Sequence, residues 1–205
     1  MSQIDTMARR AVSRGDRDGA QIWVLGALNT IARDGVDAVR VERLAREIGV
    51  SKGSFYWFFA SIDDLLARSL DHWKTHLNDA VFAQIRNLDG PVMDRMCRLI
   101  DTVFQSRLGR YDAAIRAWAM KDPRVQTVVG TVDRERLSFL VEIFSESGMS
   151  DQTARNRAHL FYRALIAESY LGAYPGASVR DAYLKELLAE LLSATLETPI
   201  RPSAP

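Results

Sequence analysis

Hydrophobic residues recur at steps of three and four along almost the whole chain, the spacing that places them on one face of an α-helix. A first stripe begins near Trp23 and ends at the Asp34-Gly35 break. Two shorter stripes follow: one ends at Gly49, and the next begins at Ser51. Patterns typical of strands are nearly absent. The sequence therefore predicts an all-α fold of about nine helices and no sheet.

Capping and breaking residues mark the helices that come later in the chain. Ser61 can accept a hydrogen bond from an unpaired backbone N–H, so we expect it to begin a long helix that continues to the Asp89-Gly90 turn. The segment from Ser178 to Asp181 is expected to cap the last helix. The helices between them are expected over residues 93–104, 111–121, 125–146 and 150–172.

The composition is that of a globular protein. Of the 205 residues, 47% are hydrophobic and 26% are charged, so the chain can bury a core. The net charge of +1 excludes a polybasic surface, and a nucleic-acid partner would need Lys and Arg gathered locally. No stretch approaches the ~18 apolar residues of a membrane helix, and the start lacks the apolar run of a secretory signal. We expect a soluble, cytoplasmic protein with no membrane contact.

Residues for metal or redox chemistry are few. Cys97, the only cysteine, excludes an intramolecular disulfide and suits a reducing compartment; its apolar neighbours favour a core position over a redox-sensing one. His72 and His76 have a metal-ligand spacing, but Asp79 is the only nearby carboxylate on a similar face. Phosphate-binding loops and nucleophile elbows are absent. We therefore expect no metal, no cofactor and no catalytic residue.

Residues 36–66 have the features of a helix-turn-helix. Ala45 is small enough for the second helix to cross the first closely, and Gly49 tolerates the positive φ that the turn requires. Ser51 can cap the second helix. That helix exposes Lys52, which can pair with phosphate or guanine, and hydroxyl groups that can bond to backbone oxygens.

This segment resembles the DNA-binding signature of the tetracycline-repressor (TetR) family. Residues 41–56 read VERLAREIGVSKGSFY and residues 59–66 read FASIDDLL, with the small residue, the Gly-Val-Ser turn and the closing Leu-Leu at the spacing of the family. The resemblance implies an N-terminal three-helix DNA-binding domain and a C-terminal helical domain that binds a ligand and dimerises. The expected divisions are a basic arm over 1–17, the helix-turn-helix domain over 18–67, the second domain over 68–197 and a disordered tail over 198–205.

The resemblance also implies which residues contact DNA. Carried over position by position, the contacts fall on Arg40, Ser51, Lys52, Gly53, Ser54, Tyr56 and Trp57. Arg40 stands where the family usually has a hydroxyl cap, and Phe58 and Ile62 replace polar residues. The arm carries Arg9, Arg10 and Arg14, which we expect to compensate by entering the minor groove or by lying along phosphates. Exposed Trp57 has one alternative, packing onto Leu25 or Val24.

The resemblance implies a small-molecule effector and a homodimer. The expected ligand residues are Trp73, Met96, Phe104, Tyr111, Arg116, Trp118, Met120, Phe139 and Tyr162, although each of these residue types is also common in a plain core. Arg116 can hold an anionic ligand group or pair with Asp112 or Glu142. The last two long helices, over 153–171 and 179–196, are expected to form the dimer interface, since they carry more apolar residues than one monomer face buries.

The sequence thus favours a DNA-binding transcriptional regulator, a ligand-responsive repressor that binds a palindromic double-stranded operator as a dimer. The alternative is a helical adaptor protein whose degenerate helix-turn-helix no longer binds operator DNA, a reading that Phe58 and Ile62 favour. An enzyme is the third class. Whether the chain represses or activates, and which effector it binds, does not follow from the sequence.

Overall fold

The computed structural model describes residues 3–105, 108–171 and 176–193. The chain divides into two compact units, one formed by residues 1–79 and 110–129 and the other by 80–109 and 130–205. Within the described ranges there is no strand, and α4, η2 and α5 form one continuous helical run, so that the α-helices number nine. The predicted all-α fold is confirmed.

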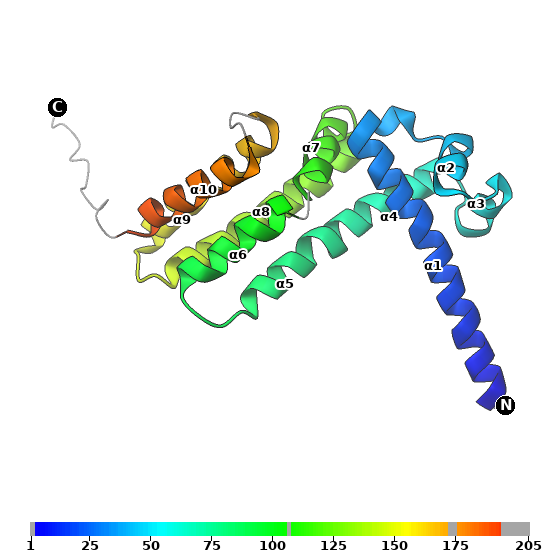
Figure 1. Cartoon of the computed structure of the whole chain (residues 1–205), viewed down its shortest axis with the longest axis horizontal. Helices are drawn as coiled ribbons and strands as arrows, with labels where there is room; N and C mark the ends of the chain where they lie inside the picture. Colours follow the sequence, from blue (N-terminus) through cyan, green and yellow to red (C-terminus); the bar gives the residue numbers. More distant parts are fainter. Residues whose placement is uncertain (1–2, 106–107, 172–175, 194–205) are drawn as a thin grey trace. The chain divides into compact units, whose positions relative to one another are not determined.

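The first unit is built on a long N-terminal helix (Figure 1). Its elements are α1 (Gln3–Asp34), the 3₁₀ turn η1 (Val36–Ala38), α2 (Val41–Ile48), α3 (Lys52–Phe58), α4 (Ile62–Lys74), the π-turn η2 (Thr75–Asp79), α7 (Leu108–Ala119) and the start of α8 (Pro123–Ser145). α1 packs against α2, α3 and α4. Trp23, Leu28, Phe55 and Leu65 are almost completely buried, so the predicted stripes of three separate helices meet in one core.

Local chemistry sets the helix ends in this unit. Gly35 has φ 85° and Gly49 has φ 74°, left-handed backbone that a residue without Cβ adopts at no steric cost. The Ser51 and Ser61 hydroxyls each accept a hydrogen bond, at 3.2 Å, from the backbone N–H three residues later. The predicted caps of α3 and α4 are therefore confirmed.

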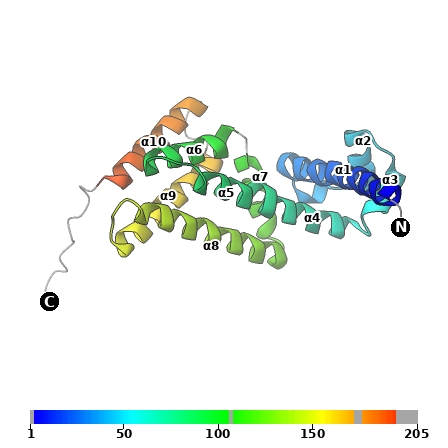
Figure 2. The ribbon, with the colours of Figure 1, turned by 90° about the horizontal axis from the view of Figure 1, so that it is seen from below.

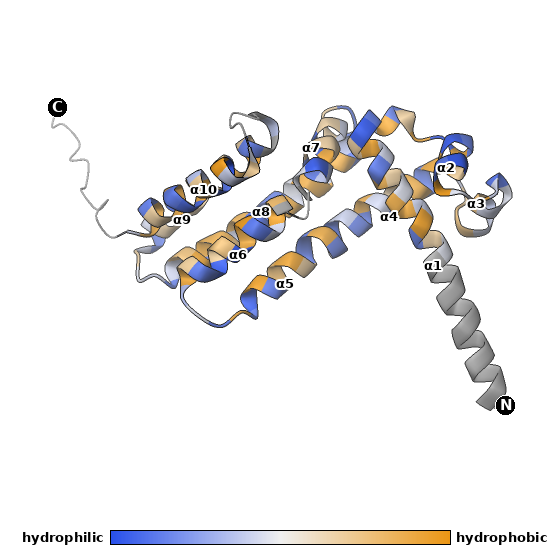
Figure 3. Ribbon diagram, viewed as in Figure 1, coloured by the Kyte–Doolittle hydropathy of each residue, from blue (hydrophilic) through white to orange (hydrophobic). Residues whose placement is uncertain are grey.

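The second unit is a bundle of amphipathic helices (Figures 2 and 3). It contains α5 (Ala80–Arg86), α6 (Val92–Gln105), the rest of α8, α9 (Asp151–Leu171) and α10 (Ala177–Leu192). α10 packs against α6 and α9, and α5 packs against α6. Ile100, Phe139, Phe144, Phe161 and Leu188 lie at the centre of this core with no exposed surface.

The structure adds detail to several predicted boundaries. α1 already begins at Gln3, so the segment expected as an arm over 1–17 is helical from that residue onward. The predicted long helix after Ser61 is present as one helical run to Arg86, and the π-turn at Thr75–Asp79 within it, with one extra residue per turn, changes the face that the helix presents. Gly176, and not Ser178, is the N-cap of α10, and its cap has no side-chain hydrogen bond. The expected tail over 198–205 lies outside the described residues.

None of the helices that the structure describes combines the length and the apolar character needed to cross a bilayer.

Candidate DNA-binding surface

The helix-turn-helix forms as predicted. The turn between α2 and α3 is held by a 2.9 Å hydrogen bond from the Val50 N–H to the Ala45 carbonyl, with Gly49 in the left-handed conformation between them. Ala45 is buried, and a larger side chain there would separate the two helices. Because the turn and the Ser51 cap are both fixed, the orientation of α3 relative to α2 is set by the backbone.

The two sides of α3 differ sharply in exposure. Phe55 and the following Phe59 are buried, and the Phe55 ring meets the Trp23 ring edge-on at 5.2 Å between centroids. On the opposite side, Tyr56 is 60% exposed and Trp57 is 85% exposed. Packing of Trp57 onto α1, the alternative considered for it, is therefore wrong. Two large aromatic side chains project from a short helix whose other side is anchored in the core.

Lys52, at the first position of α3, forms an ion pair with Glu42 in the first turn of α2. Hydrogen bonding to the Glu42 carboxylate, reinforced by its charge, raises the pKa of Lys52, and the same bond lowers the pKa of Glu42. Both side chains are exposed. Lys52 therefore stays cationic over a wide pH range, but a carboxylate that would repel phosphate lies beside it.

The remaining expected DNA contacts lie around the same face. Ser51 and Gly53 are exposed, and the Ser54 hydroxyl donates to the Ser51 carbonyl at 2.7 Å, which orients it at the first turn of α3. Arg40 is the exposed N-cap of α2 and makes no side-chain capping bond. The residues expected from the resemblance are thus brought together on one end of α2 and the exposed side of α3.

Phe58 and Ile62, the two departures from the family pattern, are partly buried. A Cβ at Gly19 on α1 would lie 2.6 Å from the Phe58 Cζ, so the Phe58 ring occupies the space beside that glycine. Phe58 therefore packs between α3 and α1, where the family usually has a polar side chain that can reach DNA. Glu42 is the residue that sequence reasoning missed. The available signal was the opposite charge of Glu42 and Lys52, which lie in the first turns of the two helices of the motif.

The expected ligand residues do not all belong to one unit. Met96, Phe139 and Tyr162 are buried in the core of the second unit, where Phe104 packs against them. Trp73, Tyr111, Arg116, Trp118 and Met120 belong to the first unit. Met120 is 87% exposed, because it lies in the turn after α7, and we leave it out of the proposed ligand site.

Two of the polar residues in the expected ligand set have partners within the chain. Arg116 Nε donates to Asp112 Oδ2 at 2.9 Å, and both side chains are largely buried. Glu142, the other partner considered for Arg116, accepts from Arg86 at 3.0 Å. The Tyr162 hydroxyl donates to Asp133 at 2.6 Å. A ligand at these positions would therefore have to share or replace existing hydrogen bonds.

The histidine and cysteine environments indicate ordinary structural roles. His72 and His76 stack with their ring centroids 4.4 Å apart, and burial, followed by the nearby His76, lowers the pKa of His72. Within the described ranges, no group of three or more His, Cys, Asp or Glu could hold a metal ion. Burial raises the pKa of Cys97, which reduces its thiolate fraction and its reactivity.

Comparison with known proteins points to one family. The model of the tetR family of bacterial regulatory proteins matches residues 25–68, the segment from the middle of α1 into α4. A comparison with curated proteins found no match.

Solved structures share the fold of the chain. A TetR-family regulator from Agrobacterium tumefaciens is 14% identical with a TM-score of 0.72, and the match covers 87% of this chain and 100% of that one. A TetR regulator from Legionella pneumophila is 15% identical with a TM-score of 0.69, covering 84% and 96%. A transcriptional regulator from Rhodococcus sp. Rha1 is 17% identical with a TM-score of 0.65, covering 84% and 93%.

At these identities the structural likeness establishes the fold, and the matched family segment coincides with the helix-turn-helix described above. Residues 25–68 therefore match the tetR family of bacterial regulatory proteins, and this match together with the shared fold supports a DNA-binding transcriptional regulator.

Proposed function

We propose that the protein is a ligand-responsive repressor that acts in the cytoplasm and binds a palindromic operator as a homodimer. One observation carries the DNA-binding part of this proposal: the exposed side of α3 presents Lys52, Tyr56 and Trp57, while Phe55 anchors its other side in the core. A helix that is fixed on one side and bears cationic and aromatic groups on the other is suited to the major groove.

Each proposed contact has a definite chemistry. Lys52 pairs with a phosphate or with guanine, and Ser51, Ser54 and Tyr56 hydrogen-bond to backbone oxygens. Trp57 covers the sugar-phosphate backbone or a base edge. A Cβ at Gly53 would meet only the Ser51 Oγ, at 3.9 Å, so the Gly53 backbone is open and can approach DNA closely. Arg40, at the N-cap of α2, adds a phosphate contact.

The helical N-terminus changes the expectation for the arginines at positions 9, 10 and 14. A helix with its side chains is about 10–12 Å wide, whereas the minor groove of B-DNA is about 6 Å wide. α1 starts at Gln3, and Figure 1 shows its first turns extending beyond α2 and α3. In this conformation the segment does not fit in the minor groove, and we propose that it lies along phosphates instead.

The effector is proposed to bind within the second unit, among the expected ligand residues that belong to its core, Met96, Phe104, Phe139 and Tyr162. A ligand shifts a conformational equilibrium only by its different affinities for the two states. It releases the operator if it prefers a dimer whose two α3 helices are not one DNA turn, ~34 Å, apart.

The dimer is proposed to form through α9 and α10, whose apolar residues fall into a buried set and an exposed set. Phe161, Leu165 and Leu191 are buried within the monomer, so they cover its own core. The large apolar side chains that remain exposed on these two helices are Leu160, Tyr170, Val179 and Tyr183. A palindromic operator repeats its half-site about a two-fold axis. A dimer with a symmetric interface has the same two-fold symmetry.

Trp57 provides a direct test of operator binding. The chain has four tryptophans, and Trp23, Trp73 and Trp118 are buried, so an aqueous quencher such as acrylamide should reach Trp57 first. We expect DNA from immediately upstream of the gene to protect this fluorescence from acrylamide, and a scrambled duplex to protect it much less at the same salt concentration. Trp57→Phe should remove the readily quenched component and serves as the assignment control.

Fluorescence anisotropy with labelled duplexes distinguishes the repressor from the adaptor. Replacing Lys52 by alanine should weaken binding to all sequences and reduce the slope of log K against log salt by about 1. Tyr56→Ala should weaken operator binding as well. If both duplexes bind weakly and equally, and neither variant changes the affinity for any other genomic fragment, the chain is an adaptor that has lost operator binding.

A further inference from the structure

A groove of about 590 Å³ lies in the first unit, away from the exposed side of α3. It is lined by Gly26, Asn29 and Arg33 of α1, Glu47 and Ile48 of α2, and Arg110 of α7. All six residues belong to the unit that carries the helix-turn-helix. The lining combines apolar surface, from Gly26 and Ile48, with guanidinium, amide and carboxylate groups, which is the mixed chemistry of small-molecule sites.

Arg110 is held in place by neutral partners. Its Nη2 donates to the Asn29 Oδ1 at 2.7 Å and to the Tyr111 hydroxyl oxygen at 2.6 Å, and that hydroxyl donates to the same Asn29 oxygen at 2.9 Å. Its guanidinium carbon lies 4.6 Å from the centre of the Tyr111 ring. This triangle fixes one nitrogen of the guanidinium, and no hydrogen bond joins its Nε or Nη1 to the rest of the described chain.

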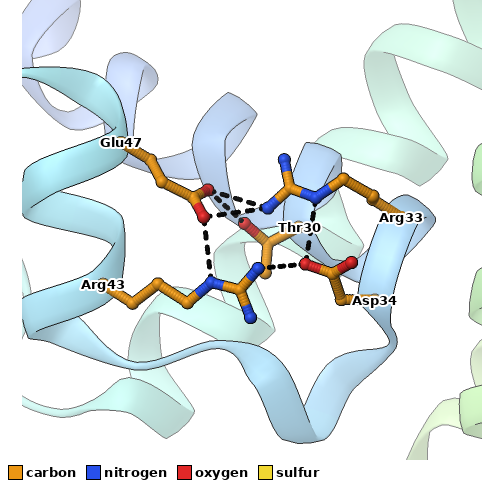
Figure 4. Close-up of polar contacts among 5 residues, drawn as sticks. All are labelled: Thr30, Arg33, Asp34, Arg43 and Glu47. Carbon is orange, nitrogen blue, oxygen red and sulfur yellow. Dashed lines mark hydrogen bonds and ion pairs between the residues drawn. The ribbon is translucent and has the colours of Figure 1, made fainter.

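The other charges at the groove compensate one another. Glu47 accepts from Arg33 at 2.9 and 3.0 Å and from Arg43 at 2.9 Å, and Asp34 pairs with both arginines (Figure 4). The two arginines lower the pKa of Glu47 to about 2, so this carboxylate is charged at neutral pH and its oxygens are occupied. Arg110 is therefore the charge at the groove that no carboxylate in the described ranges neutralises.

We propose that this groove binds a small organic carboxylate, with the Nη1 group of Arg110 holding the carboxylate and Ile48 contacting an aliphatic stem. Nη1 carries two N–H donors that no group in the described ranges accepts, and a charge-assisted hydrogen bond from it to a carboxylate is stronger than one between neutral groups. One uncompensated positive charge matches a monoanion better than a dianion such as phosphate. The site shares no residue with the proposed effector site, and Tyr111 only positions Arg110.

The proposed carboxylate site is formed by residues of three helices, α1, α2 and α7. Arg110 and Tyr111 belong to α7, Asn29 to α1 and Ile48 to α2, which leads through the turn into α3. A bound carboxylate neutralises Arg110 and adds a contact between α7 and the two helices that support α3. The proposal does not depend on operator binding, and it is tested without DNA.

Sodium butyrate is the probe, with sodium chloride at the same ionic strength as the reference. We expect butyrate to shift the NMR signals of the Arg110 Nε–H and the Asn29 side-chain amide in a saturable way at millimolar concentration in the full chain. Arg110→Met, which keeps the aliphatic stem, should abolish the saturable shift of Asn29. Arg46→Met, which removes an exposed arginine of α2 outside the groove, should leave it unchanged.

Arg110→Lys keeps the charge but not the planar guanidinium that Asn29 and Tyr111 orient, and should weaken butyrate binding several-fold with the same melting temperature as the unchanged chain. It keeps the test decisive if Arg110→Met unfolds. The proposal is overturned if chloride produces the same shifts, if the saturable shift survives in a folded Arg110 variant at full affinity, or if inorganic phosphate binds more tightly than butyrate.

Discussion

Individual side chains on α2 and α3 determine how much positive charge the DNA-binding surface presents. Lys52 is the one cation on α3, and Glu42 is its hydrogen-bonded partner. When Lys52 contacts a phosphate, this bond is lost or shared, and the Glu42 charge remains close to the DNA. We therefore expect Glu42 to reduce affinity for every DNA sequence, while its hydrogen bond orients Lys52.

Replacing Glu42 by glutamine should strengthen binding to operator and scrambled DNA. We expect an increase of about two- to fivefold, because exposed ion pairs are weak, and a slope of log K against log salt that is steeper by up to about 0.9. Anisotropy titrations at several salt concentrations measure both. Glu186→Gln, which removes the same charge from α10, is the matched control. An unchanged or weaker affinity for Glu42→Gln would mean that orienting Lys52 matters more than repulsion.

The packing of α1 on α2 depends on a close approach at Gly26. A Cβ at this position would lie 2.8 Å from the Ile48 Cγ2, an atom attached directly to the Ile48 β-carbon and therefore unable to move without a change of rotamer. At Gly130 in α8 a Cβ would meet only the flexible end of Arg134, at 3.7 Å. The packing around Gly26 therefore leaves no room for a methyl group, whereas the packing around Gly130 does.

Gly26→Ala should lower the free energy of unfolding by about 1–2 kcal/mol, since overpacking costs about 1–3 kcal/mol and better helix propensity returns up to about 1 kcal/mol. Gly130→Ala should raise it by about 0.5–1 kcal/mol, because only the propensity changes. Urea denaturation of both variants measures these values. Equal stabilisation by the two alanines would show that α1 and α2 are not in close contact at Gly26.

The same two helices are joined by the polar network around Glu47 (Figure 4). Hydrogen bonds from Arg43 and Arg33 lower the Glu47 pKa from 4.5 to about 2 in the folded chain. Below pH 4.5 the unfolded state binds more protons than the folded state at this group, so its contribution to stability is complete above pH 4.5 and is lost as the pH falls to about 2.

Glu47→Gln should therefore be less stable than the unchanged chain at pH 6, with a difference that shrinks as the pH falls from 4.5 toward 2. Chemical denaturation at a series of pH values measures this difference. Glu186→Gln again removes a carboxylate elsewhere, and its difference from the unchanged chain should not follow this pattern. A pH-independent difference for Glu47→Gln would mean that the network does not hold the carboxylate charged.

At the scale of the whole molecule, the proposed recognition of a palindromic operator requires two chains. Leu160 and Val179 are exposed on α9 and α10, and we propose that a second chain covers them. Leu160→Lys combined with Val179→Lys would place two unpaired charges in each half of that interface. We expect the dimer dissociation constant to rise by about 100-fold or more, with operator affinity falling accordingly.

Sedimentation equilibrium measures the change in association, and circular dichroism checks that the monomer stays folded. Ile22→Lys, which adds one charge at an exposed apolar position of α1, should leave the dimer intact. If the double variant dimerises as well as the unchanged chain, the interface lies elsewhere on the molecule.

Much of the DNA-binding surface was predictable from sequence because it depends on local chemistry. The turn follows from Gly49, the cap of α3 from Ser51 and the buried side of α3 from Phe55, each acting within a few residues of itself. The ion pair of Lys52 with Glu42 was not predicted. It joins residues on two helices, and only the crossing of α2 and α3 brings them together.

By itself the sequence determined the all-α class, most helix ends and the identity of the helix-turn-helix. Hydrophobic periodicity, helix caps and turn glycines act through interactions between residues close together in the sequence. Only the tertiary structure decided which side chains of those helices are exposed and which are buried. It turned Met120 outward, placed Phe58 beside Gly19, buried Phe161 and Leu165 inside the monomer and left Arg110 at a groove. Exposure depends on which distant segment covers a side chain, and that is settled by packing between helices rather than by the pattern along any one of them.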